Sequence, residues 1–415
     1  MKYVIIGNSA AGIGAVEGIR QVDNQGEILI ISNEKHHTYS RPLISYFLLG
    51  KITEENMKYR GNNFYTDNKV TLLTGVCAEK IDAKKKQISL SNGNCVSYDK
   101  LLVGTGSSPF VPPFEGLDNV KDKTAFMSLD DALKLDGMIK GKKDARVLII
   151  GAGLIGLKCA EGISKRVSKI TVADLAPRIL SSILDEEAAA IVQKHIENQG
   201  IEFKLANSVK KFYGSTAFFE NEETVSFDIL VLAVGVRPNI SLLKDIADID
   251  RGIVISKKSE TSAADIYAAG DCTQTIDISS GQNKIMALLP NAYMQGECAG
   301  INMAGRAEEK SFDKAIPMNA IGFFGLHMIT AGNYSGEAYK KSEGLNYKKL
   351  FYSGNKLNGY IIIGNVVKAG IYTSLIRERT PLDEIDFDLV CEKPGLMAFT
   401  KEDRMAKLAG LKNEQ

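Results

Sequence analysis

The sequence predicts an α/β protein with two Rossmann-like domains, and two glycine-rich turns carry that prediction. The first turn, VIIGNSAAGIG, spans residues 4–14, and the second, VLIIGAGLIG, spans residues 147–156. Each turn follows a short apolar run and precedes a helical pattern, which is the order of a strand, loop and helix that bind a dinucleotide. A chain of 415 residues is also long enough for two or three domains.

The overall composition is that of a soluble globular protein. Hydrophobic residues make up 44% of the chain, charged residues 24%, and the net charge is +1, which favours neither a nucleic acid nor a membrane partner. No apolar run approaches the roughly 20 residues that span a bilayer, and the N-terminus has no signal-peptide pattern. We therefore expect a cytoplasmic protein.

The six cysteines are far apart and form no C-x-x-C pair, which argues against a disulfide framework, a metal site and an iron–sulfur cluster. Their spacing favours a reducing compartment, and we expect Cys77, Cys95, Cys159 and Cys272 to be small buried residues. The six cysteines stand at positions 77, 95, 159, 272, 298 and 391.

The first turn has its two outer glycines but not the middle one. Residues 2–6 read as a buried parallel strand and residues 10–21 as a helix. Gly7 allows the tight turn and Gly12 the close packing of helix on strand, while Ser9 stands where the backbone approaches a pyrophosphate. Serine is the next smallest polar residue, so the turn still predicts a dinucleotide site. The alternative is a turn that is rich in glycine only for packing.

An acid follows the first turn at the end of the next strand. Residues 27–31 read as that strand, and Glu34 comes 27 residues after Gly7, a spacing somewhat longer than usual. A carboxylate at this place accepts hydrogen bonds from an adenosine ribose.

The second turn carries the complete fingerprint. A predicted strand, 145–150, precedes Gly151, Gly153 and Gly156, and a helix continues over 157–165. The N–H groups at the start of such a helix face a pyrophosphate.

The second turn is also followed by an acid. The strand 169–173 ends in Asp174, 23 residues after Gly151, where a carboxylate binds a ribose 2′-OH and repels a 2′-phosphate. NADH is thus favoured over NADPH, although Arg178 lies close enough to weaken that preference. A dehydrogenase needs one dinucleotide, whereas an enzyme with a bound flavin that accepts hydride from a nicotinamide needs two.

Three further strands place the chain in a known group. The segments YDKLLVGTGSSP (98–109), FDILVLAVGVRPN (227–239) and TSAADIYAAGDC (261–272) follow the turns in the order typical of one superfamily. With the two turns, they resemble the two-dinucleotide flavoproteins, or pyridine nucleotide–disulfide oxidoreductases. Within that superfamily, YSRPLIS (39–45) and NAIGFFGLHMITAG (319–332) look most similar to rubredoxin reductases and to the flavin part of NADH-dependent nitrite reductases.

The resemblance implies an FAD-binding domain formed by residues 1–115 and 250–310, interrupted by an NAD-binding domain over 116–249. A C-terminal α+β domain, 311–415, would cover the flavin or form a dimer contact. In this scheme Asp271 binds the ribityl chain, the pair Arg41-Pro42 lies beside the phosphates, and Ala78 holds the adenine through its backbone.

The expected contacts with FAD come from fourteen residues: Gly7, Ser9, Ala10, Ala11, Gly12, Glu34, Arg41, Pro42, Ala78, Thr105, Gly106, Asp271, Asn291 and Ala292. The expected contacts with NAD come from seven: Gly151, Gly153, Leu154, Ile155, Gly156, Asp174 and Gly235.

A further helix is expected over 288–305, with Pro290 in its first turn. In the resembled enzymes its N-terminus points at the flavin edge that gathers negative charge on reduction, where a helix dipole stabilises an anion. Its alanines at 292, 299 and 304 also suit close helix packing, and both interpretations can hold.

The chain departs from the resembled enzymes at two places. The segment TYSRPLISYFLLG (38–50) has no cysteine, so a redox-active disulfide beside the flavin is not expected. The resembled enzymes also have a lysine after the Arg-Pro pair and a glutamate after the NAD turn, where this chain has Tyr46 and Lys158. Lys158 is the one candidate catalytic residue: it would orient the nicotinamide amide or steady charge near flavin N5, with Glu161 as its i, i+3 partner. The alternative is an exposed helix lysine.

The remaining candidates favour structural roles. The pair His36-His37 is expected to be a loop pair, residues 84–86 a solvated hairpin turn, and His327 a core residue. Residues 346–365 predict a hairpin and 369–379 a helix. For 383–415 no role is assigned, although a tail that docks a partner is one alternative.

The sequence thus predicts an FAD-dependent NADH oxidoreductase. Hydride would pass from NADH to flavin N5, and electrons would then pass to an external carrier such as a rubredoxin or ferredoxin. A cysteine-free NADH oxidase and a flavoprotein subunit of a larger complex are the alternatives. The expected partners are the carrier protein and a second copy in a homodimer, with no metal.

Overall fold

The computed structural model describes residues 1–305 and 310–409. Residues 306–309 of the predicted FAD domain and 410–415 of the predicted C-terminal domain lie outside the described residues. The chain divides into two compact units. Unit 1 consists of Met1–Ser182, Ile196–Thr275 and Asn283–Asp313, and unit 2 of Ile183–His195, Ile276–Gln282 and Lys314–Gln415. The finer division of unit 1 into FAD and NAD domains stays a prediction.

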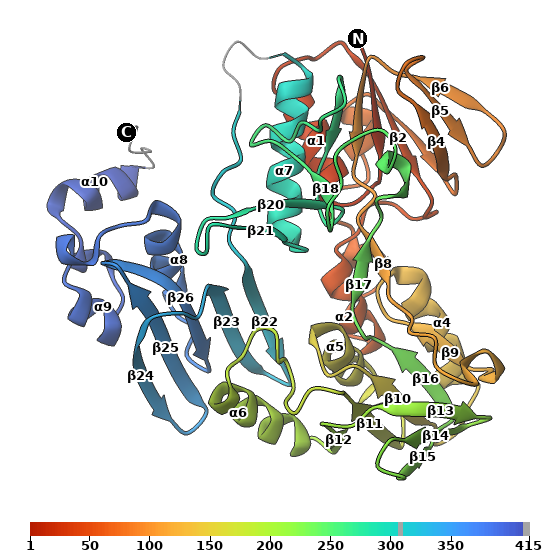
Figure 1. Ribbon diagram of the computed structural model, residues 1–415, viewed down its shortest axis with the longest axis vertical. Coiled ribbons are helices and arrows are strands. Elements are labelled where there is room, and N and C mark those ends of the chain that lie inside the picture. The colour runs from red at the N-terminus through yellow and green to blue at the C-terminus, as the bar shows by residue number, and fades with distance from the viewer. Residues whose placement is uncertain (306–309, 410–415) are drawn as a thin grey trace. The chain divides into compact units, whose positions relative to one another are not determined.

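Two five-stranded parallel sheets form the core of unit 1 (Figure 1). The first has the order β19-β7-β1-β2-β3, with β1 (Lys2–Ile6), β2 (Glu27–Ser32), β3 (Val70–Thr74), β7 (Lys100–Val103) and β19 (Ile266–Ala268). The second has the order β12-β11-β10-β16-β9, with β9 (Lys123–Ala125), β10 (Arg146–Ile150), β11 (Lys169–Ala173), β12 (Ile201–Lys204) and β16 (Ile229–Leu232). Their runs of Val, Ile and Leu are buried, as expected for parallel strands covered on both faces.

Both glycine turns leave the central strand of their sheet. Ile6 of β1 pairs with Ile31 of β2 and Val103 of β7. In the second sheet, Ile150 of β10 pairs with Ala173 of β11 and Leu232 of β16. Each turn therefore lies where the strand order reverses, which is the ligand-binding place of such sheets. The predicted strand at 2–6 is confirmed residue for residue.

Smaller sheets and ten helices complete the described chain. Further strands are β4 (Ala78–Asp82), β5 (Gln87–Leu90), β6 (Cys95–Ser97), β8 (Ser107–Pro109), β13 (Val209–Tyr213), β14 (Thr216–Phe219), β15 (Thr224–Ser226), β17 (Val236–Pro238), β18 (Ile253–Val254), β20 (Thr273–Asp277) and β21 (Gln282–Ile285). The helices are α1 (Ala10–Arg20), α2 (Ile44–Leu48), α3 (Phe64–Asp67), α4 (Leu129–Lys140), α5 (Leu154–Ile163), α6 (Glu186–Glu197), α7 (Leu289–Met303), α8 (Ala369–Glu378), α9 (Phe387–Glu392) and α10 (Lys401–Ala409).

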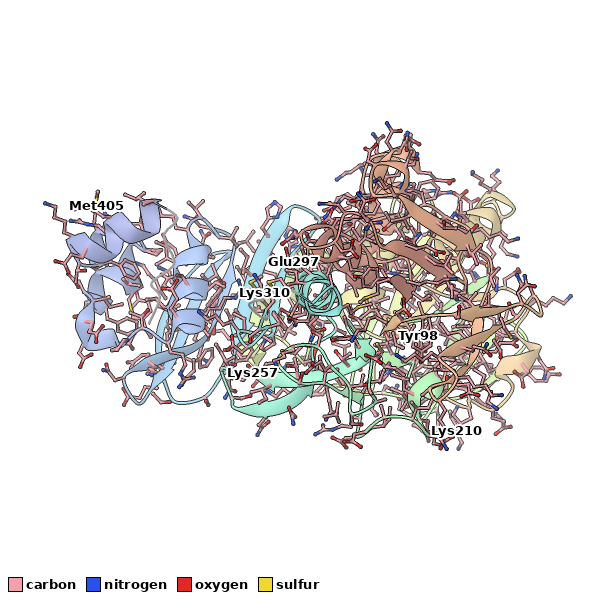
Figure 2. All side chains as sticks on the ribbon, turned by 90° about the horizontal axis from the view of Figure 1, so that it is seen from above. Tyr98, Lys210, Lys257, Glu297, Lys310 and Met405 are labelled. Atoms are coloured by element: carbon pink, nitrogen blue, oxygen red, sulfur yellow. The ribbon has the colours of Figure 1, made fainter. Side chains whose placement is uncertain are left out.

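Helices α1 and α7 pack unusually close together (Figure 1). A Cβ on Gly14 or Gly18 of α1 would collide with backbone atoms of α7, and a Cβ on Gly296 or Gly300 of α7 would collide with backbone atoms of α1. At the edge of this contact, Gln21 donates to Glu297, which is labelled in Figure 2. The crossing fixes the N-terminus of α7 relative to the first glycine turn.

We expect Gly296→Ala to destabilise the protein by about 1–3 kcal/mol, because the new methyl group meets the Ala11 carbonyl rather than a flexible side chain. Thermal unfolding measures the effect. Gly137→Ala on α4 is the matched control, since no described atom lies within 4 Å of its added Cβ. That variant should be unchanged or slightly more stable, and equal losses in both variants would contradict the close crossing.

Unit 2 is built on an antiparallel sheet with the order β22-β23-β26-β25-β24. Its strands are β22 (Met318–Phe323), β23 (Leu326–Gly332), β24 (Glu337–Glu343), β25 (Asn346–Ser353) and β26 (Lys356–Ile363). Helix α8 packs on β26 and β23, where Tyr360 hydrogen-bonds Thr373 at 2.7 Å and Tyr372 donates to the Val390 carbonyl at 2.8 Å. The predicted hairpin and helix are confirmed here.

Asp185 fastens the segment 183–195 within unit 2. Its carboxylate accepts hydrogen bonds from Lys349 Nζ at 2.8 Å, Tyr347 Oη at 2.9 Å and the Ala188 N–H at 3.0 Å. Burial alone would raise the pKa of Asp185, but these three donors hold it below its ordinary value of 3.8. The ionised form is therefore favoured in the folded protein more than in the unfolded chain.

This lowered pKa predicts acid lability of unit 2. Stability from Asp185 is present above the ordinary pKa and is lost as pH falls through the lower folded pKa. We expect Asp185→Asn to lower stability at pH 7 by about 1.5–3 kcal/mol and to flatten the decline below about pH 4. Thermal unfolding against pH checks this. Glu187→Gln breaks only an exposed pair with Lys340 and should change little.

Two expectations about single side chains are wrong. Cys77 and Cys95 are exposed, since Cys95 begins the edge strand β6 and Cys77 directly precedes the other edge strand, β4, whereas the other four cysteines are buried. His327 is exposed on β23 rather than packed in a core. Residues 84–86 lie in the turn between β4 and β5, as expected, and Lys86 there also pairs with Asp265 at 2.5 Å. Among the described residues, no helix has the length and apolar character needed to cross a membrane.

Candidate functional site

The first glycine turn has the geometry of a dinucleotide loop. Gly7 has φ +116°, and a Cβ there would collide with the Gly104 carbonyl at the end of the neighbouring strand. Gly12 would collide in the same way with the Gly7 carbonyl. Ser9 is the N-cap of α1 with extended backbone, φ −115° and ψ −164°, followed by Ala10 and Ala11 in the first turn of the helix.

The second turn repeats this geometry. Gly151 has φ +114° and faces the Ala233 carbonyl, and Gly156 packs against the Gly151 carbonyl. Gly153 is the N-cap of α5, with φ −82° and ψ −174°, and Leu154 and Ile155 follow it. The backbones at Ser9 and Gly153 are thus both extended, so the two loops are structural equivalents.

The middle position explains why serine is allowed in the first turn. No described atom lies within 4 Å of a Cβ added to Gly153, unlike the crowded outer glycines. The fold itself therefore does not require glycine there, and the open space is what a pyrophosphate needs for close approach. Among the described residues, no side chain caps either helix N-terminus, so the first N–H groups of α1 and α5 face this space.

Distant segments converge on the first turn. A Cβ on Gly270 would lie 3.3 Å from Ala11 Cβ and 3.4 Å from Ala292 Cβ, so the loop after β19 meets both helices. Gln295 of α7 accepts from the Gly270 N–H at 2.8 Å and fixes this arrangement. Asn291 is also buried near the start of α7.

Asp271 lies in the same loop, with Ser107 Oγ 3.5 Å from its carboxylate. Burial raises the pKa of Asp271, against the opposing influence of Arg41. A partly buried carboxylate with few partners among the described residues favours a ligand that donates hydrogen bonds, as the hydroxyls of a ribityl chain do.

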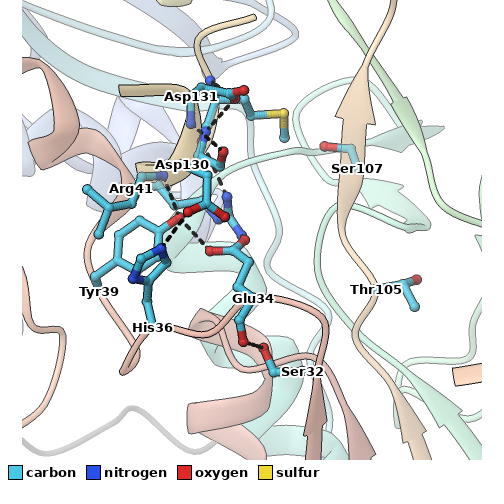
Figure 3. Close-up of polar contacts among 12 residues, drawn as sticks. Ser32, Glu34, His36, Tyr39, Arg41, Thr105, Ser107, Asp130 and Asp131 are labelled. Atoms are coloured by element: carbon cyan, nitrogen blue, oxygen red, sulfur yellow. Dashed lines mark hydrogen bonds and ion pairs between the residues drawn. The ribbon is translucent and has the colours of Figure 1, made fainter. Parts of the chain in front are cut away.

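Glu34 is the centre of a polar network (Figure 3). Arg41 forms a short ion pair with Glu34 Oε1, and Tyr39 Oη donates to Glu34 Oε2 at 2.7 Å. Arg41 follows Glu34 by seven residues and begins a short 3₁₀ helix with Pro42, which is exposed. The structure thus brings together three of the residues expected around FAD, and adds Tyr39, which the sequence analysis did not single out.

The same network joins the start of α4. Tyr39 Oη accepts from the Leu129 N–H at 2.9 Å, Arg41 Nη1 donates to the Met127 carbonyl at 3.3 Å, and His36 Nε2 lies 2.8 Å from Asp130 Oδ1 (Figure 3). The pair His36-His37 is a loop pair, as expected, but His36 has a partner. Three contacts therefore tie the Glu34 loop to the helix that precedes β10.

Two other predicted FAD residues, Thr105 and Gly106, are hydrogen-bonded to Asn239. Thr105 Oγ1 donates to the Asn239 carbonyl at 2.7 Å, and Asn239 returns a bond to the Thr105 carbonyl at 2.9 Å. The Gly106 carbonyl accepts from the Asn239 N–H, and β8 pairs with β17 directly beyond. This two-stranded ribbon also holds Gly235, whose carbonyl accepts from the Phe110 N–H. The Thr105 hydroxyl thus has a partner within the chain.

Asp174 directly follows β11, as expected, and its carboxylate already accepts hydrogen bonds within the chain. Its carboxylate accepts from the Ala152 N–H at 2.6 Å and from the Ala176 N–H at 2.8 Å. The acid thereby fixes the second glycine loop, and its role at a ribose stays a prediction. Leu175 next to it is 74% exposed, an apolar surface on which an adenine ring can pack.

Lys158 is not an exposed helix lysine, so that alternative is wrong. Its side chain is only 12% exposed and forms a short ion pair with Glu161, which is 7% exposed. The Lys158 ammonium also lies 4.7 Å from the centre of the Tyr46 ring. The expected i, i+3 partner is confirmed, and the two residues that replace the usual lysine and glutamate touch each other.

Ala78 has the least direct placement. It packs in the apolar cluster beneath the ends of β1 and β2, and the nearby Gly75 N–H donates to the Glu34 carbonyl.

Residues missed by the sequence analysis, chiefly Tyr39 and Asn239, act through contacts between segments that lie far apart along the chain. Tyr39 stands between Glu34 and Arg41 in the sequence, and this position is the one signal by which it could have been predicted as a site residue.

The chemistry of the site fits two dinucleotides. Within the described chain, the N-cap residues leave the first N–H groups of α1 and α5 without a side-chain cap, and two such helix N-termini fit two pyrophosphates. Within residues 1–305 and 310–409, no cluster of His, Cys, Asp and Glu has the arrangement of a metal site.

The chain matches the family model described as pyridine nucleotide-disulphide oxidoreductase over residues 1–296. It is 30% identical over 393 residues to the NADH-dependent phenylglyoxylate dehydrogenase subunit epsilon of Aromatoleum evansii, which covers 92% of each chain. It is 27% identical over 371 residues to the NADH-rubredoxin oxidoreductase of Clostridium acetobutylicum, covering 88% of this chain and 91% of the relative.

A longer relative matches in part. The chain is 28% identical to the nitrite reductase [NAD(P)H] of Bacillus subtilis over 92% of its own length, but it spans only 48% of that relative. Among solved structures, the covalent putidaredoxin reductase–putidaredoxin complex superposes with a TM-score of 0.85 at 21% identity, over 100% of this chain and 99% of the other. At this identity the structural likeness shows the fold alone.

Proposed function

The chain belongs to the pyridine nucleotide-disulphide oxidoreductase family, and from that premise we propose an FAD-dependent NADH oxidoreductase that passes electrons to a separate carrier protein. The overall reaction balances as NADH plus two oxidised one-electron carriers giving NAD⁺, one proton and two reduced carriers. The observation that carries the proposal is the pair of equivalent loops after β1 and β10, each with an acid at the end of the next strand.

The two loops would hold the two dinucleotides. FAD would bind on the loop Gly7–Gly12, with Glu34 at its adenosine ribose and Asp271 at its ribityl chain, and NADH on the loop Gly151–Gly156, with Asp174 at its ribose. FAD, when bound, supplies the uptake of a hydride and the release of its two electrons one at a time. The chain's own residues provide position, because hydride transfer needs alignment and no side-chain acid or base.

Thiol chemistry has no support in the site. Cys77 stands next to Ala78, the residue expected at the adenine, and is exposed. Cys159 and Cys272 stand close in sequence to the predicted binding residues Gly156 and Asp271, and both are fully buried. Burial raises the pKa of each thiol, so neither forms the thiolate that attacks a disulfide. This favours direct electron transfer from the flavin to the external acceptor. The six free cysteines also suit a reducing compartment such as the cytoplasm.

A second candidate is the role of a flavoprotein subunit in a larger oxidoreductase. It is favoured by one observation, the match over 92% of both chains to a protein named as a subunit of an NADH-dependent dehydrogenase. In that role the same FAD and NADH sites would serve a partner subunit rather than a diffusing carrier. A homodimer is compatible with either role.

The test begins with the purified FAD-loaded protein. Anaerobic addition of one equivalent of NADH should bleach the flavin absorbance, and a rubredoxin or ferredoxin should restore it faster than oxygen does. Restoration by oxygen alone at a comparable rate would favour an NADH oxidase instead. Absence of FAD, or no bleaching by NADH, would overturn the proposal. Failure of every small carrier, with copurification of other subunits, would favour the subunit role.

A further inference from the structure

We propose that Lys158 binds the carboxamide oxygen of the nicotinamide, and that Tyr46 and Glu161 are positioning residues that hold its ammonium in place. This inference rests on the proposed function in one respect, the binding of NADH on the loop after β10. An ammonium group can only donate hydrogen bonds, and the carboxamide oxygen is the acceptor that the nicotinamide offers.

The position of Lys158 on α5 directs its side chain toward the ligand end of the helix. It stands four residues after Leu154, the first residue of α5, and so lies on the same face one turn further on. Side chains in a helix tilt toward its N-terminus. The long lysine side chain therefore reaches back toward the glycine loop.

The contact with Tyr46 places the ammonium on the side where the nicotinamide must lie. Asp174 stands at the end of β11, so the adenosine end of the ligand lies on that side of β10. Helix α2, which carries Tyr46, packs against α5 and also against α4, the helix that leads into β10 from the opposite side (Figure 1). A dinucleotide that extends across the N-terminus of α5 away from Asp174 runs toward α2.

The energetics favour a functional reason for this lysine. A cation near a helix N-terminus is unfavourable because the N-terminal end of the helix dipole is positive, and burial of the ammonium adds a desolvation cost. Glu161 and the Tyr46 ring offset these costs. Lys51 offers the contrast: its ammonium lies 5.5 Å from the same ring, but it is exposed and stands outside α5.

The test compares two ligands that differ only in the nicotinamide. Calorimetric titration of the FAD-loaded protein with NAD⁺ and with ADP-ribose should show that Lys158→Met weakens NAD⁺ by at least about tenfold and leaves ADP-ribose within about twofold. Lys51→Met should bind both ligands as the unchanged protein does. Tyr46→Phe, which keeps the ring, should retain NAD⁺ affinity, whereas Tyr46→Leu should lose part of it.

Two outcomes would overturn the inference. Unchanged NAD⁺ affinity in Lys158→Met would remove the contact, and equal weakening of NAD⁺ and ADP-ribose would move the lysine to the pyrophosphate. The comparison is independent of flavin reduction. A protein that binds NAD⁺ but is not bleached by NADH would overturn the proposed function, while the two-ligand comparison would still decide this one. If Lys158→Met loses both ligands and also unfolds at a lower temperature, Lys158→Arg decides the question. That variant keeps the positive charge and should restore NAD⁺ affinity.

Discussion

Gly7→Ala is expected to yield a protein without FAD. Gly7 has φ +116°, which an alanine adopts only with strain, and its new Cβ would collide with the Gly104 carbonyl on the neighbouring strand. Gly7 and Gly104 directly follow β1 and β7, and each is hydrogen-bonded to a neighbouring strand of the sheet, which restricts their movement. Together the strain and the collision should cost at least about 3 kcal/mol. The measurements are the ratio of flavin to protein absorbance and the unfolding temperature.

The control separates strain from collision. Gly93 also has positive φ, +83°, but no described atom lies within 4 Å of a Cβ added there. Gly93→Ala should therefore lose about 1 kcal/mol and retain its FAD. If Gly7→Ala kept its flavin and unfolded at the same temperature as Gly93→Ala, the first loop would not be the tight turn that the dinucleotide site requires.

The loops could be predicted from sequence because their chemistry is local. A glycine with positive φ, a helix start and an acid after the next strand all lie within about thirty residues, and their order is fixed by the strand–loop–helix unit. The departure at Ser9 was also interpretable, since Ser9 and Gly153 have equivalent extended backbones and a Cβ added to Gly153 meets no described atom within 4 Å. The sequence motif therefore encodes the backbone geometry of the two glycine loops, and the structure has that geometry.

The contacts around the loops could not be predicted in the same way. Tyr39 Oη joins Glu34 to the N-terminus of α4, ninety residues further along the chain. The burial of Lys158 depends on Tyr46, which α2 supplies from a distant part of the sequence. Such contacts follow from tertiary packing, and no periodicity records them. The exposure of Cys77 and Cys95 likewise depends on how the small sheet β4-β5-β6 packs.

The Tyr39 hydroxyl connects segments that adjoin the two parallel sheets of unit 1. It donates to the acid expected at the FAD ribose and accepts from the helix that leads into β10. The hydroxyl is thus shared between the loop of one sheet and the helix that feeds the other. A single buried group that uses both its donor and its acceptor resists rotation of either segment.

Asp174→Ala is expected to lower the preference for NADH over NADPH by roughly tenfold or more. The carboxylate at the end of β11 would accept the ribose 2′-OH of NADH and repel the 2′-phosphate of NADPH, and Arg178 nearby would then favour the phosphate. The ratio of kcat/KM for the two coenzymes measures this preference. An unchanged ratio would remove the role assigned to Asp174.

Asp174→Ala should also have a second effect, on the glycine loop itself, and the experiment must separate this effect from the change in coenzyme preference. Asp174 also accepts the N–H groups of Ala152 and Ala176, so alanine should weaken the loop for both coenzymes and lower stability by about 1–3 kcal/mol. Asp174→Asn keeps one acceptor oxygen but removes the charge. If repulsion of the 2′-phosphate sets the preference, asparagine should shift the coenzyme ratio nearly as far as alanine while losing less stability. If the loop contacts alone matter, asparagine should retain the ratio of the unchanged protein. The two substitutions thus distinguish an acid that reads the coenzyme from one that only braces its loop.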